Sequence, residues 1–162
     1  MPEKLIIASL EPIKVGQTFD SLPLHVTLMP WFEISDHNTK TLYGYLGTIA
    51  RKQDFLELIG EDEAMFGPDE NVPVRRLADA NIRQMHRDIE LAVRWSEGVA
   101  CNSDYIREKY QPHVSHTNGR SFERGRTVKL SAMQVVDRDP STRVRTTERI
   151  YDLGVTNNRQ VG

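Results

Sequence analysis

The sequence predicts an α+β fold in which helices pack on antiparallel sheet. Two segments, roughly residues 38–52 and 79–96, repeat their apolar residues at helical spacing. Seven other apolar segments are short, rich in β-branched or aromatic residues and bounded by turn residues, which favours strands. These segments are residues 4–10, 23–29, 54–59, 72–77, 110–116, 126–136 and 144–153. Each half of the chain is therefore expected to contain strands, one helix and further strands, and this element order suggests a loose duplication.

Each expected helix has an apolar stripe and a candidate N-cap. The stripe of the first helix consists of Leu42, Tyr45, Leu46 and Ile49, and that of the second of Ile82, Met85, Ile89 and Val93. Asp36, Asn38 or Thr39 is available to cap the first helix, and Asp79 to cap the second, because short polar side chains accept hydrogen bonds from the free N–H groups there.

The length and composition are typical of a single folded domain, which we expect to cover residues 1–162. Hydrophobic residues make up 38% and charged residues 27%, the balance of a soluble globular protein. The longest apolar run, residues 5–10, is far shorter than the roughly 20 residues of a membrane span. The N-terminus lacks the pattern of a secretory signal, and the lone Cys101 excludes an internal disulfide and a cysteine-based zinc site. We therefore expect a cytoplasmic protein that does not contact a membrane.

Charge is nearly balanced overall, with 21 basic and 23 acidic residues. This balance argues against a strongly cationic surface that coats nucleic acid non-specifically. The distribution is uneven. Residues 120–149 carry eight basic and four acidic side chains, whereas residues 54–70 carry seven carboxylates and no Lys or Arg. We expect an anionic ligand to bind beside the basic segment, and the acidic segment to lie away from the ligand.

The five histidines are the most informative residues: His25, His37, His86, His113 and His116. Three of them begin a His-x-Ser/Thr triplet. In His25-Val26-Thr27, strand alternation places the imidazole and the hydroxyl on one face and the apolar neighbours on the other. His113-Val114-Ser115 repeats this arrangement. The third triplet begins at His37 in a polar run at an expected helix start, where capping is the simpler interpretation.

Two strands that each present an imidazole and a hydroxyl on one face form a set of groups that suits the cleavage of a phosphodiester. One neutral imidazole can take a proton from the attacking water while the other, protonated, gives a proton to the leaving oxygen. The hydroxyls can donate hydrogen bonds to the non-bridging phosphate oxygens. Histidine suits both roles because its ordinary pKa of about 6.5 makes both protonation states accessible near neutral pH.

With these two motifs, 88 residues apart and each closely preceded by proline, the sequence resembles the 2H phosphoesterases, which include the 2′-5′ RNA ligase and cyclic phosphodiesterase group. The resemblance implies a bilobal, pseudo-twofold fold, with antiparallel sheets around a central groove and helices packed outside. It implies that His25 and His113 are the acid/base pair and that Thr27 and Ser115 bind the phosphate. Many relatives carry a leucine and then an arginine after the second motif, whereas here His116-Thr117 follow and Arg120 comes later.

The implied activity is metal-independent hydrolysis of a 2′,3′-cyclic nucleotide phosphate or of a 2′-5′ linked oligonucleotide, without a cofactor. The expected partner is a nucleotide or short RNA phosphoester; no obligate protein partner is expected, and the chain is expected to be a monomer. The alternatives are a module that binds a nucleotide in the same groove without turnover, and an unrelated α+β domain in which the triplets are coincidental.

Five further residues are candidates for substrate binding. Trp31 shares strand parity with His25, and Tyr110 lies just before the second motif, so either ring could stack on a nucleobase or belong to the core. Arg120, Arg124 and Arg126 suit a phosphate or an exposed charged loop.

The remaining histidines have simpler expected roles. His116 points to the Val114 side of its strand and is expected to be packed or at a rim. His86, on the second helix, is expected to be structural or exposed. A metal site at His113 and His116 lacks the carboxylate or cysteine partners of known zinc patterns.

Overall fold

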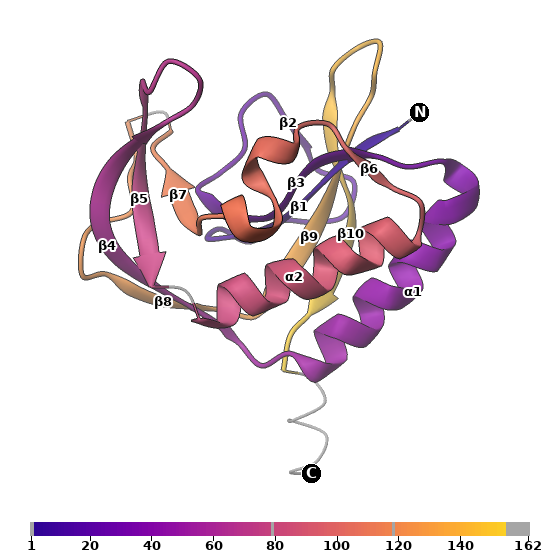
Figure 1. Cartoon of the computed structure of the whole chain (residues 1–162), viewed down its shortest axis with the longest axis horizontal. Helices are drawn as coiled ribbons and strands as arrows, with labels where there is room; N and C mark the ends of the chain where they lie inside the picture. The colour runs from indigo at the N-terminus through magenta and orange to yellow at the C-terminus, as the bar shows by residue number, and fades with distance from the viewer. Residues whose placement is uncertain (1, 79, 118, 155–162) are drawn as a thin grey trace.

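The computed structural model describes residues 2–78, 80–117 and 119–154, which form strands and two long helices (Figure 1). The first half of the chain contains β1 (Glu3–Ser9), β2 (Thr18–Phe19), β3 (His25–Glu33), α1 (Asp36–Lys52), β4 (Leu56–Phe66) and β5 (Val72–Ala78). The second half contains α2 (Ala80–Trp95), β6 (Val99–Ala100), β7 (His113–Ser115), β8 (Thr127–Leu130), β9 (Ala132–Arg138) and β10 (Arg145–Asp152). Two short 3₁₀ turns, Ser103–Tyr105 and Arg107–Lys109, precede β7.

The strands form a single curled sheet in the order β2-β10-β9-β1-β3-β7-β5-β4-β8, with β6 added beside β3. The strands of the described residues pair antiparallel throughout. Helices α1 and α2 contact each other, and they cover one face of the sheet through contacts with β10, β3 and β4 (Figure 1). The predicted α+β fold, with helices outside antiparallel sheet, is confirmed. The strands β3 and β7 lie at the centre of the sheet, where one half of the sheet, β2-β10-β9-β1-β3, meets the other half, β7-β5-β4-β8.

Most of the core lies between the sheet and the helices. Fully buried side chains on this face include Val26 and Leu28 of β3, Leu46 of α1, and Met85 and Ile89 of α2. The spacing of the last two confirms the apolar stripe predicted for α2. None of the helices in the described residues is long and apolar enough to cross a membrane.

A smaller apolar cluster covers the opposite face of β1 and β9. It consists of Leu5, Ile7, Ile13, Leu22 and Val136, with Phe19 and Trp31 packed against it. Because Ile6 and Ala8 of β1 belong to the main core, this strand is buried on both faces. The histidine-bearing face of the sheet is therefore partly apolar beside β3.

The first helix begins two residues earlier than the sequence predicts. Ser35 is the N-cap: its backbone is extended, and its hydroxyl accepts a hydrogen bond from the Asn38 N–H at 3.3 Å. The expected caps Asp36, Asn38 and Thr39 all lie inside the helix, so that prediction is wrong. The second expected cap, Asp79, lies outside the described residues.

Several strand boundaries also differ from the prediction: β3 covers residues 25–33 instead of 23–29, and β7 covers residues 113–115 instead of 110–116. The strand β4 continues to Phe66, past the expected end at residue 59, because β5 pairs with it as far as Phe66 and Val72. The segment predicted as one strand over residues 126–136 is two strands separated by Ser131. The first of these pairs with β4 and the second with β1 and β10, so the chain changes partner at Ser131.

Gly60 is required by a close approach of two backbone segments. A Cβ atom at this position would lie 2.3 Å from the Glu123 carbonyl oxygen. The same loop makes two backbone hydrogen bonds with Gly60. The Gly60 N–H donates to the Arg126 carbonyl oxygen at 3.0 Å, and the Gly125 N–H donates to the Gly60 carbonyl oxygen at 2.9 Å. This contact fixes the loop that carries the buried Phe122 against β4.

We predict that Gly60→Ala destabilises the protein by about 1–3 kcal/mol, the range for forcing extra atoms into a packed site. The matched control is Gly44→Ala, because Gly44 is exposed within α1 and a Cβ there meets nothing within 4 Å. That control should gain up to about 1 kcal/mol from helix propensity. Denaturant unfolding of the three proteins measures both effects; equal stability of Gly60→Ala and the parent would contradict the argument.

Candidate active site

The two His-x-Ser/Thr motifs lie side by side in the sheet. Val26 of β3 is the cross-strand partner of Val114 of β7. This antiparallel register places His25 beside Ser115 and Thr27 beside His113. Both valines are fully buried, so the four polar side chains project from the opposite face. An antiparallel pair has a local twofold axis, and here that axis relates one motif to the other.

All four side chains line one cavity of about 420 Å³. The imidazoles are diagonal neighbours across the strand pair, and such neighbours have Cβ atoms about 7 Å apart. That spacing suits two groups that act from opposite sides of one phosphorus atom.

Each histidine is held in the same way by the backbone. The Nδ1 of His25 lies 2.7 Å from the Pro23 carbonyl oxygen, and the Nδ1 of His113 lies 2.7 Å from the Gln111 carbonyl oxygen. A carbonyl only accepts, so each Nδ1 carries a proton and donates it, which assigns the tautomer. In both neutral rings the Nε2 lone pair is left for proton transfer.

Burial lowers the pKa of both imidazoles below 6.5. In each case the hydrogen bond to the backbone carbonyl partly opposes this effect. The pKa of His25 is lowered further by the charges of His113 and Arg145. The site by itself therefore favours two neutral imidazoles at neutral pH. An anion bound between them would stabilise the protonated form of one.

The rest of the cavity lining includes residues from segments that contain no recognisable motif. The ring of Phe66 stands edge-on to the His113 ring, with centroids 4.7 Å apart. Beyond His113 the cavity adjoins a second one of about 410 Å³, and both are lined by Thr27, Pro30, Phe66, Gly67, Tyr105 and His113. Phe66, Gly67 and Tyr105 were missed in the sequence because no periodicity or spacing relates them to the histidines.

The acidic segment does not lie away from the site, so that expectation is wrong. The strand β5 pairs with β7, Arg75 being opposite Val114, and β4 pairs with β5. Figure 1 shows β4 and β5 on the same side of the sheet as β7. The end of the β4–β5 hairpin contributes Glu70 to the lining of the second cavity and Pro68 to that of the histidine cavity. Sheet pairing has overridden the electrostatic preference that the sequence indicated.

Trp31 lines the cavity that contains His25. The Arg138 guanidinium lies over its ring, 4.0 Å from the centroid. Arg138 is in turn held by Glu3, to which its Nε donates at 2.6 Å. The Trp31 ring is thus a supported aromatic surface at one end of the site.

Tyr110 belongs to the core, which corrects the expectation that it could stack on a base. Its side chain is only 3% exposed, and its ring stacks on that of His86 with centroids 3.9 Å apart. Its hydroxyl donates to the Thr27 carbonyl oxygen at 2.7 Å. Tyr110 therefore holds the first motif strand in place next to the second.

His86 is structural, which is one of the two roles expected for it. It is fully buried, its Nδ1 donates to the Leu28 carbonyl oxygen at 2.6 Å, and its Nε2 accepts from the Arg107 N–H at 3.0 Å. Burial lowers its pKa. The neutral ring is thus fully hydrogen-bonded and supports the strand that carries Thr27.

The three arginines expected to bind phosphate have other surroundings. Arg120 pairs with Glu11, and the Arg126 guanidinium lies 5.2 Å from the Phe122 ring centroid. Arg124 is exposed. None of the three is a lining residue of the two cavities as the described residues form them. The basic segment approaches the site instead through Arg138, which lies over the Trp31 ring, and through Arg145. The Arg145 side chain donates to the Asp20 carbonyl oxygen on the loop before His25.

The other two histidines lie outside the cavities. His37 is exposed in the first turn of α1. His116 is half-buried, and its Nε2 lies 3.9 Å from the Glu63 Oε2.

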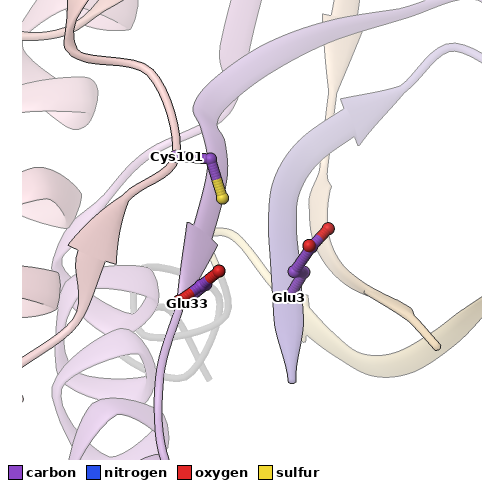
Figure 2. Close-up of side chains that lie close together, drawn as sticks. All are labelled: Glu3, Glu33 and Cys101. Atoms are coloured by element: carbon purple, nitrogen blue, oxygen red, sulfur yellow. The ribbon is translucent and has the colours of Figure 1, made fainter. Parts of the chain in front are cut away.

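A group of side chains with metal-ligating atoms lies well away from the histidine pair. Ligand atoms of Glu3, Glu33 and Cys101 lie within 4.8 Å of one another (Figure 2). Glu3 and Glu33 are cross-strand partners at one end of β1 and β3, whereas His25 pairs with Ser9 at the other end. Glu3 is already bonded to Arg138. In the part of the chain that the structure describes, this group is separate from the candidate active site.

Comparison with known proteins gives matches only at the level of structure. No family model and no curated protein matches the sequence. The fold is similar to that of a crystallised phosphoesterase, with a TM-score of 0.66 and 14% identity over 94% of this chain and 99% of that one. It is also similar to Escherichia coli LigT in complex with 3′-AMP, with a TM-score of 0.65 and 15% identity over 94% of this chain and 99% of LigT.

A third similar structure is TT0787 of Thermus thermophilus, with a TM-score of 0.61 and 13% identity over 93% of this chain and 97% of that one. LigT has also been crystallised with phosphate, NADP+ and ATP. These similarities extend over nearly the whole of each chain and show a shared fold.

We predict that both site histidines titrate below pH 6.5, and that His113→Asn raises the pKa of His25 because it removes one of the charges that lower it. Proton and nitrogen NMR of the imidazoles measures both values. His37→Asn, on the exposed start of α1, is the control and should leave the pKa of His25 unchanged. A pKa of His25 that falls in the His113 variant would contradict this arrangement of charges.

Proposed function

We propose that this chain is a metal-independent phosphodiesterase that hydrolyses a 2′,3′-cyclic nucleotide phosphate or a 2′-5′ linked oligonucleotide. The observation that carries the proposal is the Val26–Val114 register, which gathers two imidazoles and two hydroxyls in one cavity. The fold that the chain shares with phosphoesterases supports it. The LigT complexes with 3′-AMP and phosphate make a nucleotide phosphate the natural ligand class to test.

In the proposed reaction, one imidazole acts as base and the other as acid. The neutral Nε2 takes a proton from water as the water oxygen bonds to phosphorus. The bond from phosphorus to the leaving oxygen breaks, and the protonated imidazole gives its proton to that oxygen. A cyclic phosphate is thereby opened to a phosphomonoester and a free hydroxyl. The backbone carbonyls behind both rings keep the Nε2 atoms directed at the phosphate.

The hydroxyls of Thr27 and Ser115 are proposed to bind the non-bridging oxygens. Thr27 lies beside His113, and Ser115 lies beside His25, so each hydroxyl is next to the imidazole of the other motif. Hydrogen bonds from fixed donors stabilise the charge that develops on the phosphate in the transition state. Trp31 is proposed to contact the nucleoside, because its supported ring lines the same cavity.

We predict that His25→Ala and His113→Ala each lower kcat by about 10²- to 10⁴-fold, the usual contribution of one proton-transfer group. The double variant should lose little more, because both groups serve one transition state. Thr27→Ala and Ser115→Ala should lose less, since proton transfer remains. The assay follows hydrolysis of 2′,3′-cyclic mononucleotides and 2′-5′ dinucleotides in EDTA.

His37→Ala and His116→Ala are the controls for these variants and should keep activity near that of the parent. Activity that depends on added Zn²⁺ or Mn²⁺, or a His37 variant as inactive as the His25 variant, would refute the assignment. Tight nucleotide binding without turnover of any diester would favour the binding-module alternative.

We predict a bell-shaped pH profile of kcat/KM with its optimum below pH 6.5. Activity requires one protonated and one neutral imidazole, so it is greatest between the two apparent pKa values of the pair. Burial lowers both pKa values in the free protein, which moves the optimum to acidic pH. The optimum of kcat should lie at higher pH, because the bound phosphate anion stabilises the imidazolium. Steady-state kinetics from about pH 4.5 to about pH 9, around the ordinary imidazole pKa, measures both profiles; a kcat/KM optimum above about pH 7.5, roughly one unit above that pKa, would contradict the prediction.

A further inference from the structure

The two cavities at the site differ in polarity. Among the described residues, the cavity that contains both histidines and both hydroxyls is lined, apart from the histidines, by no ionisable side chain except the Tyr105 phenol. Its other walls are apolar or aromatic: Leu5, Leu22, Pro30, Trp31, Phe66, Pro68 and Val72. The adjoining cavity beyond His113 has Glu70, Asp104 and Lys109 in its lining, two carboxylates against one ammonium.

Two arginines beside these walls are paired with carboxylates, whereas a third, Arg145, donates to the Asp20 carbonyl oxygen and adds a positive charge near His25. Arg138, over the Trp31 ring, is bonded to Glu3. Arg76, whose guanidinium lies 5.9 Å from the Phe66 ring centroid, lies 3.7 Å from an Asp62 oxygen. The two ion pairs reduce the positive charge that could attract a second anionic group of a substrate, and Arg145 is not a lining residue of either cavity.

From this charge pattern we infer that the substrate carries a single phosphate, the one that is cleaved. This inference rests on the proposed function and narrows its substrate class to small diesters. The group on the apolar side is an uncharged aromatic moiety that contacts Trp31. The group on the other side bears hydroxyls or amines, which donate hydrogen bonds to the carboxylates of Glu70 and Asp104.

A second phosphate on either group would be disfavoured for a physical reason. In the apolar cavity the second phosphate would lose hydration without gaining a cationic partner among the lining side chains other than the two histidines, which hold the first phosphate. In the other cavity it would meet two carboxylates against one ammonium, and this net negative lining repels a second phosphate. Longer oligonucleotides and 5′-phosphorylated nucleotides are therefore poor substrates.

The experiment compares adenosine 2′,3′-cyclic phosphate with the same nucleotide bearing an additional 5′-phosphate. We expect kcat/KM to be at least about tenfold higher for the first, equivalent to about 1.4 kcal/mol. The double variant Glu70→Gln, Asp104→Asn should reduce this ratio, because it removes both cavity carboxylates. The matched control is Glu57→Gln, an exposed carboxylate of β4 outside both cavities, which should keep the ratio of the parent.

A binding measurement separates this inference from the proposed function. Calorimetry should show adenosine 3′-phosphate binding at least about tenfold more tightly than adenosine 3′,5′-bisphosphate. If no diester is hydrolysed, the proposed function fails, while the ratio of affinities still decides the inference. Equal affinities, tighter binding of the bisphosphate, or no binding of either nucleotide would overturn it.

Discussion

The pairing of Val26 with Val114 joins the two halves of the sheet. Both side chains are fully buried in the core under the helices, so a shift of either strand by one residue would turn an imidazole and a hydroxyl inward. Burial of the two valines thus fixes the position of all four polar groups on the other face. The strand β7 has only three residues, and its place is secured by pairing with β5 on its other side.

A buried aromatic pair reinforces this junction. Tyr110 lies three residues before His113, and its hydroxyl donates to the Thr27 carbonyl oxygen of the other motif strand. His86, stacked on Tyr110, donates to the next carbonyl oxygen, that of Leu28. The two rings therefore tie helix α2 and the segment before β7 to the backbone of β3. A site made from two strands far apart in sequence needs such support, because neither strand fixes the other through local contacts.

Burial of the two imidazoles conflicts with the protonation state that the proposed acid/base reaction needs. It lowers the pKa of His25 and His113 and so favours two neutral rings, yet acid/base catalysis needs one of them protonated. In the proposed reaction the phosphate anion of the substrate resolves this conflict, because one imidazolium compensates its charge. The proposal therefore couples protonation of the site to occupancy by an anion, and the apolar walls around His25 would strengthen that coupling by keeping the local dielectric low.

The sequence by itself determined the α+β class, both helices and the alternation that puts His25 with Thr27 and His113 with Ser115 on one strand face each. These features depend on local periodicity, which a single segment reveals. Only the tertiary structure decided that the two motifs are cross-strand neighbours, that the acidic β4–β5 hairpin forms a wall of the site, and that Tyr110 is a buried support. Strand pairing and side-chain packing join residues far apart in the chain, and no local pattern records which partner a strand will choose.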